Sequence, residues 1–247
     1  MSVEENEVEK PSISQPQRKK VKLGDFVLLD YSCLIKDSGE LYYTTNSEIA
    51  KKFNVYDKSR KYAPQLVIIG AKEVPRGLEE ELLKMEEGEE KEIELPPEKG
   101  FGKRDERKVR VLLIKRFREP PKPGDIVVVN NERGRVLSVS SGRVRVDFNH
   151  PLAGKNLLYK VKITKIVRDP IERAKLLLER AFPNISMDRF NIRSEENTLY
   201  VELPPDAFSR ESLFLEKNVY VNMIGKYVKK FKKVVFMEPF VVASAST

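Results

Sequence analysis

Residues 65–102 form the stretch that most constrains how this 247-residue chain can fold. In order, the stretch reads as a strand, a turn, a short helix, a second strand and a glycine-flanked aromatic residue. Three apolar residues recur on one face of the helix: Leu78, Leu82 and Met85. The strand at 91–95 alternates polar and apolar residues, as half-buried strands do. A short helix between two strands predicts a curved sheet whose concave face the helix fills.

Composition excludes several classes of site. The chain has a single cysteine, Cys33, and a single histidine, His150, so it lacks the residues for a zinc site or a disulfide framework. No apolar run reaches the roughly 18 residues of a membrane span, and the polar N-terminus has no secretory signal. We therefore expect a cytoplasmic protein with no cofactor, no metal and no membrane contact. Cys33 should be a small buried apolar residue, and His150 should satisfy a turn.

Almost all of the net charge of +8 lies in one block of the chain. Residues 103–147 hold 13 lysines and arginines against 6 acidic residues, a net charge of +7. Four arginines of this block alternate with other residues on two predicted strands: Arg133, Arg135, Arg143 and Arg145. A basic surface of this kind favours nucleic-acid phosphates, or simply keeps a small domain in solution.

The residues before the opening stretch predict a tail, a hairpin and a loop. Residues 1–21, rich in proline, serine, glutamine and charge, should be disordered. Strand formers at 26–35 precede a tight turn and a second strand at 41–43. Residues 44–64 lack a clear period, and they predict a long loop with one turn of helix at 47–52.

After residue 103 the pattern is all-β. The segment 108–114 alternates and then runs apolar, and a proline cluster follows it. Three short alternating pieces come next, separated by Asn-Asn and Ser-Ser turns: 125–129, 134–139 and 142–148. The longest predicted strand in the chain, residues 157–167, follows a turn-rich loop.

A separate α/β domain is predicted over residues 169–247. It opens with an Asp-Pro pair, and apolar residues at helical spacing predict a helix over 171–180. Asp206 or Ser209 should cap a second helix that reaches about Lys230. Short strands are expected at four places in this domain: 190–192, 199–203, 234–236 and 240–242.

Three segments, in order, carry a motif pattern: GAKEVPRGLEEELLKMEEGE (70–89), PPEKGFGK (96–103) and NHPLAGKNLLYKVKI (149–163). They resemble FKBP-type peptidyl-prolyl cis-trans isomerases of the long archaeal kind, which are similar to bacterial SlyD. The resemblance implies an α+β fold. Its parts are an FKBP half-barrel of antiparallel sheet wrapped on a short helix, an inserted all-β domain and a C-terminal α/β domain. The chain divides accordingly into a disordered tail (1–21), the isomerase domain (22–102 and 148–168), the insert-in-flap domain (103–147) and the C-terminal domain (169–247).

The resemblance also implies a pocket for proline that apolar and aromatic side chains line. The residues it places there are Tyr31, Tyr42, Tyr43, Val74, Leu78, Phe101 and Tyr159. The aromatic side chains and Val74 would form the walls, Leu78 would form the floor, and Tyr43 would take a polar role. Without the resemblance, these aromatic residues would more often be read as core.

Three positions depart from the family pattern, and each departure replaces or removes a polar group. Tyr43 stands where the family usually has an aspartate, and Phe101 stands where a tyrosine is common. Pro75 stands where a residue with a free N–H is usual, and proline has no N–H to donate. We therefore expect a weakened isomerase in which client holding is relatively more important.

The resemblance implies unfolded or proline-containing polypeptides as partners, with the insert binding unfolded chains along exposed sheet edges. The basic insert also resembles small SH3-like barrels of ribosomal and nucleic-acid-binding proteins. The alternative function is therefore a non-enzymatic folding factor that binds the ribosome or RNA through the insert. A homodimer through the helices of the C-terminal domain is left open by the sequence.

Overall fold

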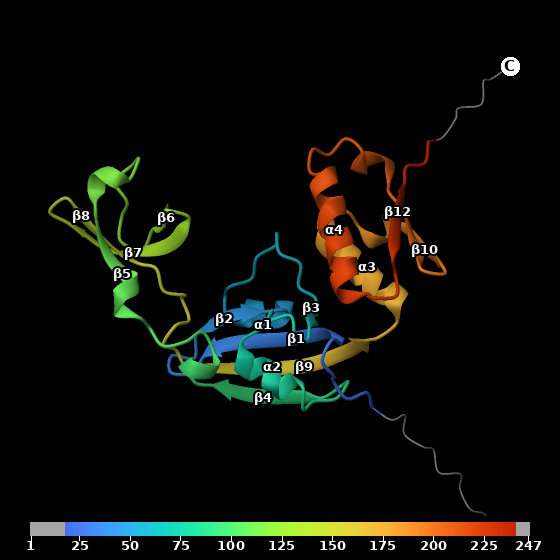
Figure 1. The fold of residues 1–247 in the computed structure, drawn as a ribbon. Helices are drawn as coiled ribbons and strands as arrows, with labels where there is room; N and C mark the ends of the chain where they lie inside the picture. Colours follow the sequence, from blue (N-terminus) through green and yellow to red (C-terminus); the bar gives the residue numbers. More distant parts are fainter. Residues whose placement is uncertain (1–17, 241–247) are drawn as a thin grey trace, which may run out of the picture.

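The chain forms three β-sheets (Figure 1), and the computed structural model describes residues 18–240. The central sheet has five strands in the order β2-β1-β9-β4, with β3 also paired to β1. All of its pairings are antiparallel. Its strands are β1 (Phe26–Ile35), β2 (Leu41–Thr44), β3 (Gln65–Ile68), β4 (Glu90–Leu95) and β9 (Leu157–Val167). The combination of antiparallel sheets and a few helices confirms the predicted α+β class.

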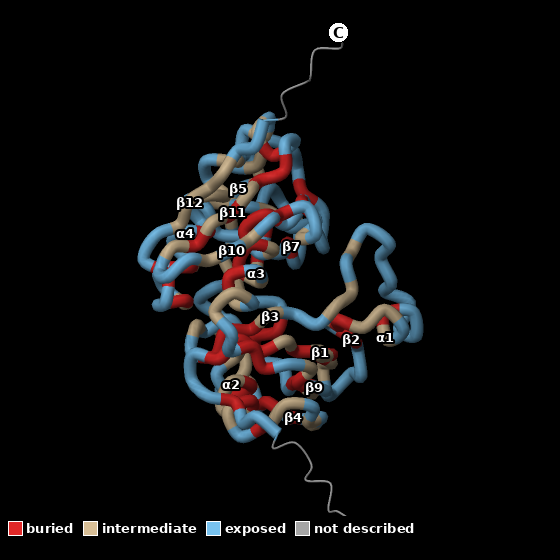
Figure 2. Tube along the Cα trace, turned by 90° about the vertical axis from the view of Figure 1, so that its right-hand side faces the viewer, coloured by how far each residue is buried: buried red, intermediate tan, exposed pale blue. Residues whose placement is uncertain are grey.

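Helix α2 (Arg76–Leu82) packs against one face of the central sheet, as its apolar spacing predicts. Leu78, Leu82 and Met85 are almost fully buried there with residues of β4 and β9. Figure 2 shows this core as the buried region around α2, β1, β4 and β9. Pro75 precedes the helix as its N-cap residue, and its φ of −54° with an extended ψ of 143° sets how the chain enters the helix. The predicted turn of helix is also present, as α1 (Ser47–Lys52).

Residues 109–147 form a second sheet, here called the insert sheet, in the order β5-β8-β7-β6. Its strands are β5 (Val109–Leu113), β6 (Ile126–Val129), β7 (Glu132–Ser140) and β8 (Arg143–Asp147). They confirm the four strand-like pieces expected there. The buried core of this sheet is small and consists of Val136, Val144 and Val146. A Cβ on Gly134 would lie 2.6 Å from a methyl carbon of Val146, so the close packing requires glycine there.

Residues 170–240 form the C-terminal unit, with helices α3 (Pro170–Ala181) and α4 (Leu213–Tyr227) beside a three-stranded sheet. Its strands are β10 (Asn191–Glu195), β11 (Thr198–Glu202) and β12 (Lys233–Met237), with β11 and β12 parallel. Phe26, Ile68 and Val167 of the central sheet belong to the same buried cluster as Tyr220 of α4. The C-terminal unit therefore shares its core with the central sheet. None of the helices between residues 18 and 240 is long and apolar enough to cross a membrane.

Helix α4 begins later than predicted, at Leu213, and it ends earlier, at Tyr227. Asp206 does not cap it, because Asp206 lies in the 3₁₀ turn Pro205–Ala207 and the N-cap residue is Ser212. Arg189 binds both carboxylate oxygens of Asp206, at 2.5 and 2.9 Å. Ser209, the other predicted cap, donates its hydroxyl to the carbonyl oxygen of Asp206 at 3.1 Å. Both predicted caps are thus engaged in a turn that precedes the helix, and the prediction of their role was wrong.

The ends of the described chain also bear on the predictions. Residues 18–21 were part of the predicted disordered tail, but their backbone hydrogen-bonds to residues 85–87. Val21 N donates to the carbonyl oxygen of Met85, and the carbonyl oxygen of Lys19 accepts from Glu87 N. These bonds satisfy backbone groups of the segment after α2 and hold residues 18–21 against it. Residues 1–17 lie outside the described residues. Of the strand predicted at 240–242, Phe240 lies in no strand, and the other two residues are outside the described range.

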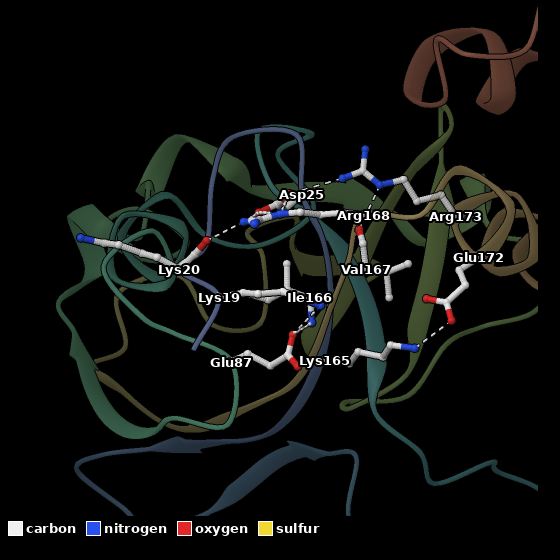
Figure 3. Close-up of polar contacts among 10 residues, drawn as sticks. All are labelled: Lys19, Lys20, Asp25, Glu87, Lys165, Ile166, Val167, Arg168, Glu172 and Arg173. Atoms are coloured by element: carbon white, nitrogen blue, oxygen red, sulfur yellow. Dashed lines mark hydrogen bonds and ion pairs between the residues drawn. The ribbon is translucent and has the colours of Figure 1, made fainter. Parts of the chain in front are cut away.

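A buried carboxylate, that of Asp25, joins the start of β1 to the C-terminal unit (Figure 3). It binds Arg168 at 2.7 Å and Arg173 of α3 at 3.3 Å. Arg168 also donates to the carbonyl oxygen of Lys20 at 2.7 Å, and Lys22 N donates to Asp25 at 2.9 Å. Burial alone would raise the pKa of Asp25. The hydrogen bonds from Arg168 and Lys22 and the two guanidinium charges outweigh burial and lower this pKa below 3.8.

Asp25→Asn should destabilise the fold, because it leaves two guanidinium groups without their carboxylate. We expect a loss of about 2–4 kcal/mol in the free energy of unfolding near pH 7, measured by urea denaturation. Since the folded pKa is lowered, the carboxylate contributes fully above the unfolded pKa of about 4 and loses its contribution as pH falls through the folded pKa. The difference from wild type should therefore shrink below about pH 4. Asp188→Asn, at an exposed position, is the control. A difference that stays constant from pH 7 to pH 3 would contradict this account.

Candidate functional site

Three tyrosines from three neighbouring strands meet on one face of the central sheet: Tyr31 on β1, Tyr43 on β2 and Tyr159 on β9. The ring of Tyr31 stacks on that of Tyr43 with centroids 5.1 Å apart, and it lies 6.2 Å from the ring of Tyr159. The strand register explains this convergence, because Cys33 of β1 is paired with both Tyr43 and Tyr159. Cys33 itself is buried, as predicted.

Three further predicted residues complete this cluster. Leu78 of α2 is 1% exposed, while Val74 and Phe101 are partly buried and pack against the same core. We call the six residues the aromatic cluster: Tyr31, Tyr43, Val74, Leu78, Phe101 and Tyr159. It presents a partly exposed aromatic face that an aliphatic core supports from behind. A face of this kind can hold an apolar ring and keep water from it.

Tyr42, the remaining predicted site residue, lies on β2 at the edge of the central sheet. It is 46% exposed and lines a groove of about 1040 Å³ between the central sheet and the insert sheet. Strand β2 has a bulge at Tyr42, because Cys33 pairs with Tyr43 while Leu34 pairs with Leu41, so its side chains do not simply alternate there. Burial raises the pKa of Tyr159, and Cys33, Tyr31 and Tyr42 raise it further, so Tyr42 lies near that residue of the cluster. Apolar and basic side chains of the insert sheet also line the groove, among them Ile126, Leu137, Arg133 and Arg135.

Two tyrosine hydroxyls share an acceptor that the sequence analysis missed. Tyr31 and Tyr43 both donate to Gln65 Oε1, at 3.0 and 3.2 Å. Burial, followed by the presence of Tyr43, raises the pKa of Tyr31, so its hydroxyl keeps its proton near neutral pH. Gln65 is the first residue of β3. A polar residue at the start of a strand is ordinary, so the sequence contains no signal for this contact.

Arg60 is a second residue that sequence reasoning missed. Its guanidinium carbon lies 4.1 Å from the ring centroid of Tyr43 and 5.2 Å from that of Tyr62. Its Nη2 donates to the carbonyl oxygen of Thr44 at 2.8 Å. Arg60 belongs to the loop between α1 and β3, which rises above the central sheet between the insert sheet and the C-terminal unit (Figure 1). The cation–π contact therefore holds Tyr43 from the loop side.

The ring of Phe101 lies parallel to the ring of His150, with centroids 4.0 Å apart. His150 Nδ1 accepts from Leu152 N at 3.1 Å, so the histidine satisfies a turn, as predicted. Burial lowers the pKa of His150, which favours a neutral ring. The contact connects the aromatic cluster to the segment that returns from the insert sheet.

Helix α3 of the C-terminal unit braces the loop that carries Val74. Arg180 Nη1 donates to Glu73 Oε1 at 2.5 Å, and the other oxygen of this carboxylate accepts from Ile68 N at 3.0 Å. Lys72, the preceding residue, has a left-handed φ of 60°, which is costly for a residue with a side chain. A contact from another part of the chain therefore holds a strained loop beside the aromatic cluster.

Between residues 18 and 240, no group of three or more histidine, cysteine or carboxylate side chains is arranged to hold a metal ion. The polar groups of the site are instead hydroxyl, amide and guanidinium groups. They can orient a ligand by hydrogen bonds, and the aromatic cluster can exclude water from it.

Models of known protein families match the chain in three consecutive stretches. The model described as FKBP-type peptidyl-prolyl cis-trans isomerase matches residues 17–116. The model described as FKBP26, IF domain matches residues 114–152, and the FKBP26 C-terminal model matches residues 170–241. The last two stretches contain strands of the insert sheet and the whole C-terminal unit.

Curated relatives agree with these models. The short-type peptidyl-prolyl cis-trans isomerase of Methanocaldococcus jannaschii is 35% identical over 149 residues, which is 94% of that protein and 59% of this chain. The chain belongs to the FKBP-type peptidyl-prolyl cis-trans isomerase family. The SlyD isomerase of Aeromonas hydrophila is 33% identical over 51% of this FKBP-type chain and 60% of its own length. The FKBP-type 16 kDa isomerase of Escherichia coli is 26% identical over 42% of this chain and 74% of its own length. The family resemblance predicted from the three motifs is confirmed.

Proposed function

We propose that this FKBP-type chain isomerises X-Pro bonds of polypeptides at the aromatic cluster and holds unfolded clients on the insert sheet. The observation that carries the isomerase site is the convergence of Tyr31, Tyr43 and Tyr159 from three strands over the buried Leu78. The rings of Tyr31 and Tyr159 offer a proline ring apolar contact, and Tyr43 supports Tyr31 from its other face. The cluster contains no nucleophile and needs none, because isomerisation breaks no covalent bond.

The chemistry required is the stabilisation of a twisted amide. Rotation about an X-Pro bond faces a barrier of roughly 20 kcal/mol, which amide resonance sets. The twisted amide has lost that resonance, and its carbonyl is less polar than in the planar form. A surface that excludes water accommodates the twisted form better than bulk water does, so it binds the transition state more tightly than the substrate. The aromatic cluster is built for this role.

We propose further that the activity is weakened relative to a typical family member. Phe101 brings no hydroxyl, and Pro75 brings no N–H to the entrance of α2. Tyr43 cannot take over as a free donor, because its hydroxyl already binds Gln65. The apolar contribution to catalysis remains, and part of the hydrogen-bonding contribution is lost.

Tyr159→Ala should lower kcat/KM for a proline tetrapeptide at least tenfold, because it removes the buried side of the aromatic cluster. Phe101→Tyr should raise kcat/KM about two- to fivefold by adding one donor. A protease-coupled isomerisation assay measures both. Phe53→Ala, at a surface loop position, is the control that should leave activity unchanged. Full activity in the Tyr159→Ala enzyme would exclude this cluster as the site.

Client holding is assigned to the two edges of the insert sheet. Val111 and Leu113 of edge strand β5 are exposed, and so are Ile126 and Val128 of edge strand β6. An exposed apolar edge strand offers both backbone hydrogen bonds and side-chain contacts to an extended chain. A small sheet with two such edges fits an unfolded polypeptide as its partner.

One observation favours the alternative, a folding factor that binds the ribosome or RNA. The strand register sets the four arginines of β7 and β8 on one face of the insert sheet, because Arg135 pairs with Asp147 and Arg145 with Ser138. All four are exposed, and among the described residues none of them forms an ion pair with a carboxylate. Such a row can follow a phosphate backbone. We rank this function second, because the same face is flanked by the apolar edges.

The two readings of the insert differ in their response to salt and to paired substitutions. Val111→Ser with Val128→Ser should weaken binding of a permanently unfolded, reduced protein about fivefold or more, even in high salt. Arg143→Gln with Arg145→Gln should leave that binding within twofold. Fluorescence anisotropy of the labelled client measures both. Binding of single-stranded RNA that is tight only in low salt and lost in the arginine variant would favour the alternative.

We also propose a homodimer through α4 and place the protein in the cytoplasm. Helix α4 is apolar beyond the face it buries, with Phe214 80% and Leu215 66% exposed. Two copies of this face would cover each other across a twofold axis. The single cysteine, Cys33, is free and buried, which fits a reducing compartment.

Leu215→Glu should convert the proposed dimer to a monomer, because it places charge in the apolar contact. Light scattering coupled to size exclusion measures the mass, and Lys229→Glu at an exposed position just past the other end of α4 is the control. A wild-type protein that is monomeric at tens of micromolar would exclude the dimer.

A further inference from the structure

The aromatic cluster itself has few free donors for the carbonyl groups of a bound client. Pro75 has no N–H, and Phe101 has no hydroxyl. The hydroxyls of Tyr31 and Tyr43 both donate to Gln65 Oε1, and the hydroxyl of the buried Tyr159 is directed to the thiol of Cys33. A hydrogen bond to a carbonyl beside the proline would hold the client while its amide rotates. If the client is anchored in this way, the donor must come from another side chain at the edge of the cluster.

Gln65 has the orientation that such a donor needs. Its Oε1 accepts from two hydroxyls, which occupy both of its lone pairs. The amide group is planar, so Nε2 and its two protons point away from the tyrosines. Among residues 18–240, no group accepts a hydrogen bond from Nε2, and Gln65 is exposed. The amide protons are therefore available to a molecule that lies on the cluster.

The surrounding contacts hold Gln65 in place before any client binds. Its backbone pairs with Leu29 in the central sheet, which fixes where the side chain starts. Tyr43, one of its two hydroxyl partners, lies between Arg60 and Tyr31. The guanidinium carbon of Arg60 is 4.1 Å from the ring centroid of Tyr43, and the ring centroid of Tyr31 is 5.1 Å from it. A free glutamine side chain loses much of its rotamer freedom when it is ordered, and here the tyrosines have already ordered it. A donor that is ordered in advance is more effective than a mobile one.

We propose that Gln65 is a catalytic residue whose Nε2 donates to a backbone carbonyl next to the isomerising X-Pro bond. It takes the place of the N–H that Pro75 lacks. Tyr31 then has two roles, since its ring contacts the proline while its hydroxyl, together with that of Tyr43, orients the amide. The proposal rests on the aromatic cluster being the isomerase site.

The decisive test compares Gln65→Glu with Gln65→Leu. At neutral pH the new carboxylate still accepts from both tyrosines, but it has no proton to donate. The leucine removes both the acceptor and the donor. We expect each variant to lower kcat/KM for a proline tetrapeptide about five- to tenfold, as the loss of one hydrogen bond to the client predicts. Near-UV circular dichroism should show that the tyrosines of Gln65→Glu keep their wild-type environment.

The controls separate this proposal from the site on which it rests. Asn191→Leu changes another exposed amide at the first residue of a strand, far from the cluster, and should keep full activity. If Gln65→Glu keeps wild-type efficiency while Gln65→Leu loses it, Gln65 only positions the tyrosines, and the proposal is wrong. Full efficiency in both variants also overturns it. Tyr159→Ala is measured alongside: if it loses activity when the Gln65 variants do not, only the role of Gln65 fails, and if it keeps activity, the site itself fails.

Discussion

Strand β9 pairs with β1 along its whole length, and the rest of the structure depends on this contact. The chain reaches β9 from the insert sheet, pairs it with β1 on one side and β4 on the other, and then continues into helix α3 (Figure 1). The pairing closes a long loop that contains the whole insert sheet, so many hydrogen bonds and buried side chains must offset its entropic cost. Tyr159 lies within β9, and Arg168 follows its end. Without this strand, neither the aromatic cluster nor the contact with Asp25 would form.

The C-terminal unit is built onto the isomerase part of the chain. Phe26 and Val167 of the central sheet share a buried cluster with its helices, and Asp25 binds Arg173 of α3. A little further along α3, Arg180 holds Glu73 beside Val74 of the aromatic cluster. Because Arg180 binds the residue next to Val74, a shift of α3 would also move the part of the proposed proline site that Val74 forms. The insert sheet has a different relation to the site, because it is joined through the two chain segments that carry Phe101 and His150.

The aromatic cluster shows how a site can keep its shape while its polar groups change partners. Tyr43 stands where the family pattern has an acidic residue, yet it stacks on Tyr31 and keeps the face closed. Gln65 then receives both hydroxyls, and Arg60 covers the outer side of Tyr43. The polar network has therefore moved to the loop and strand next to the cluster.

Local patterns in the sequence were enough to predict the central strands, helix α2 and the four insert strands. The three motifs predicted the family, and through it Tyr31, Leu78 and Tyr159 as site residues. These features follow from short-range periodicity, turn residues and motif order, all of which are present in the chain itself. The tertiary structure alone decided that Gln65 and Arg60 contact the aromatic cluster. It also decided that Asp206 binds Arg189 in a turn before α4, which begins only at Leu213. Each of these outcomes depends on a side chain brought from a distant part of the sequence, and local pattern carries no information about such a partner.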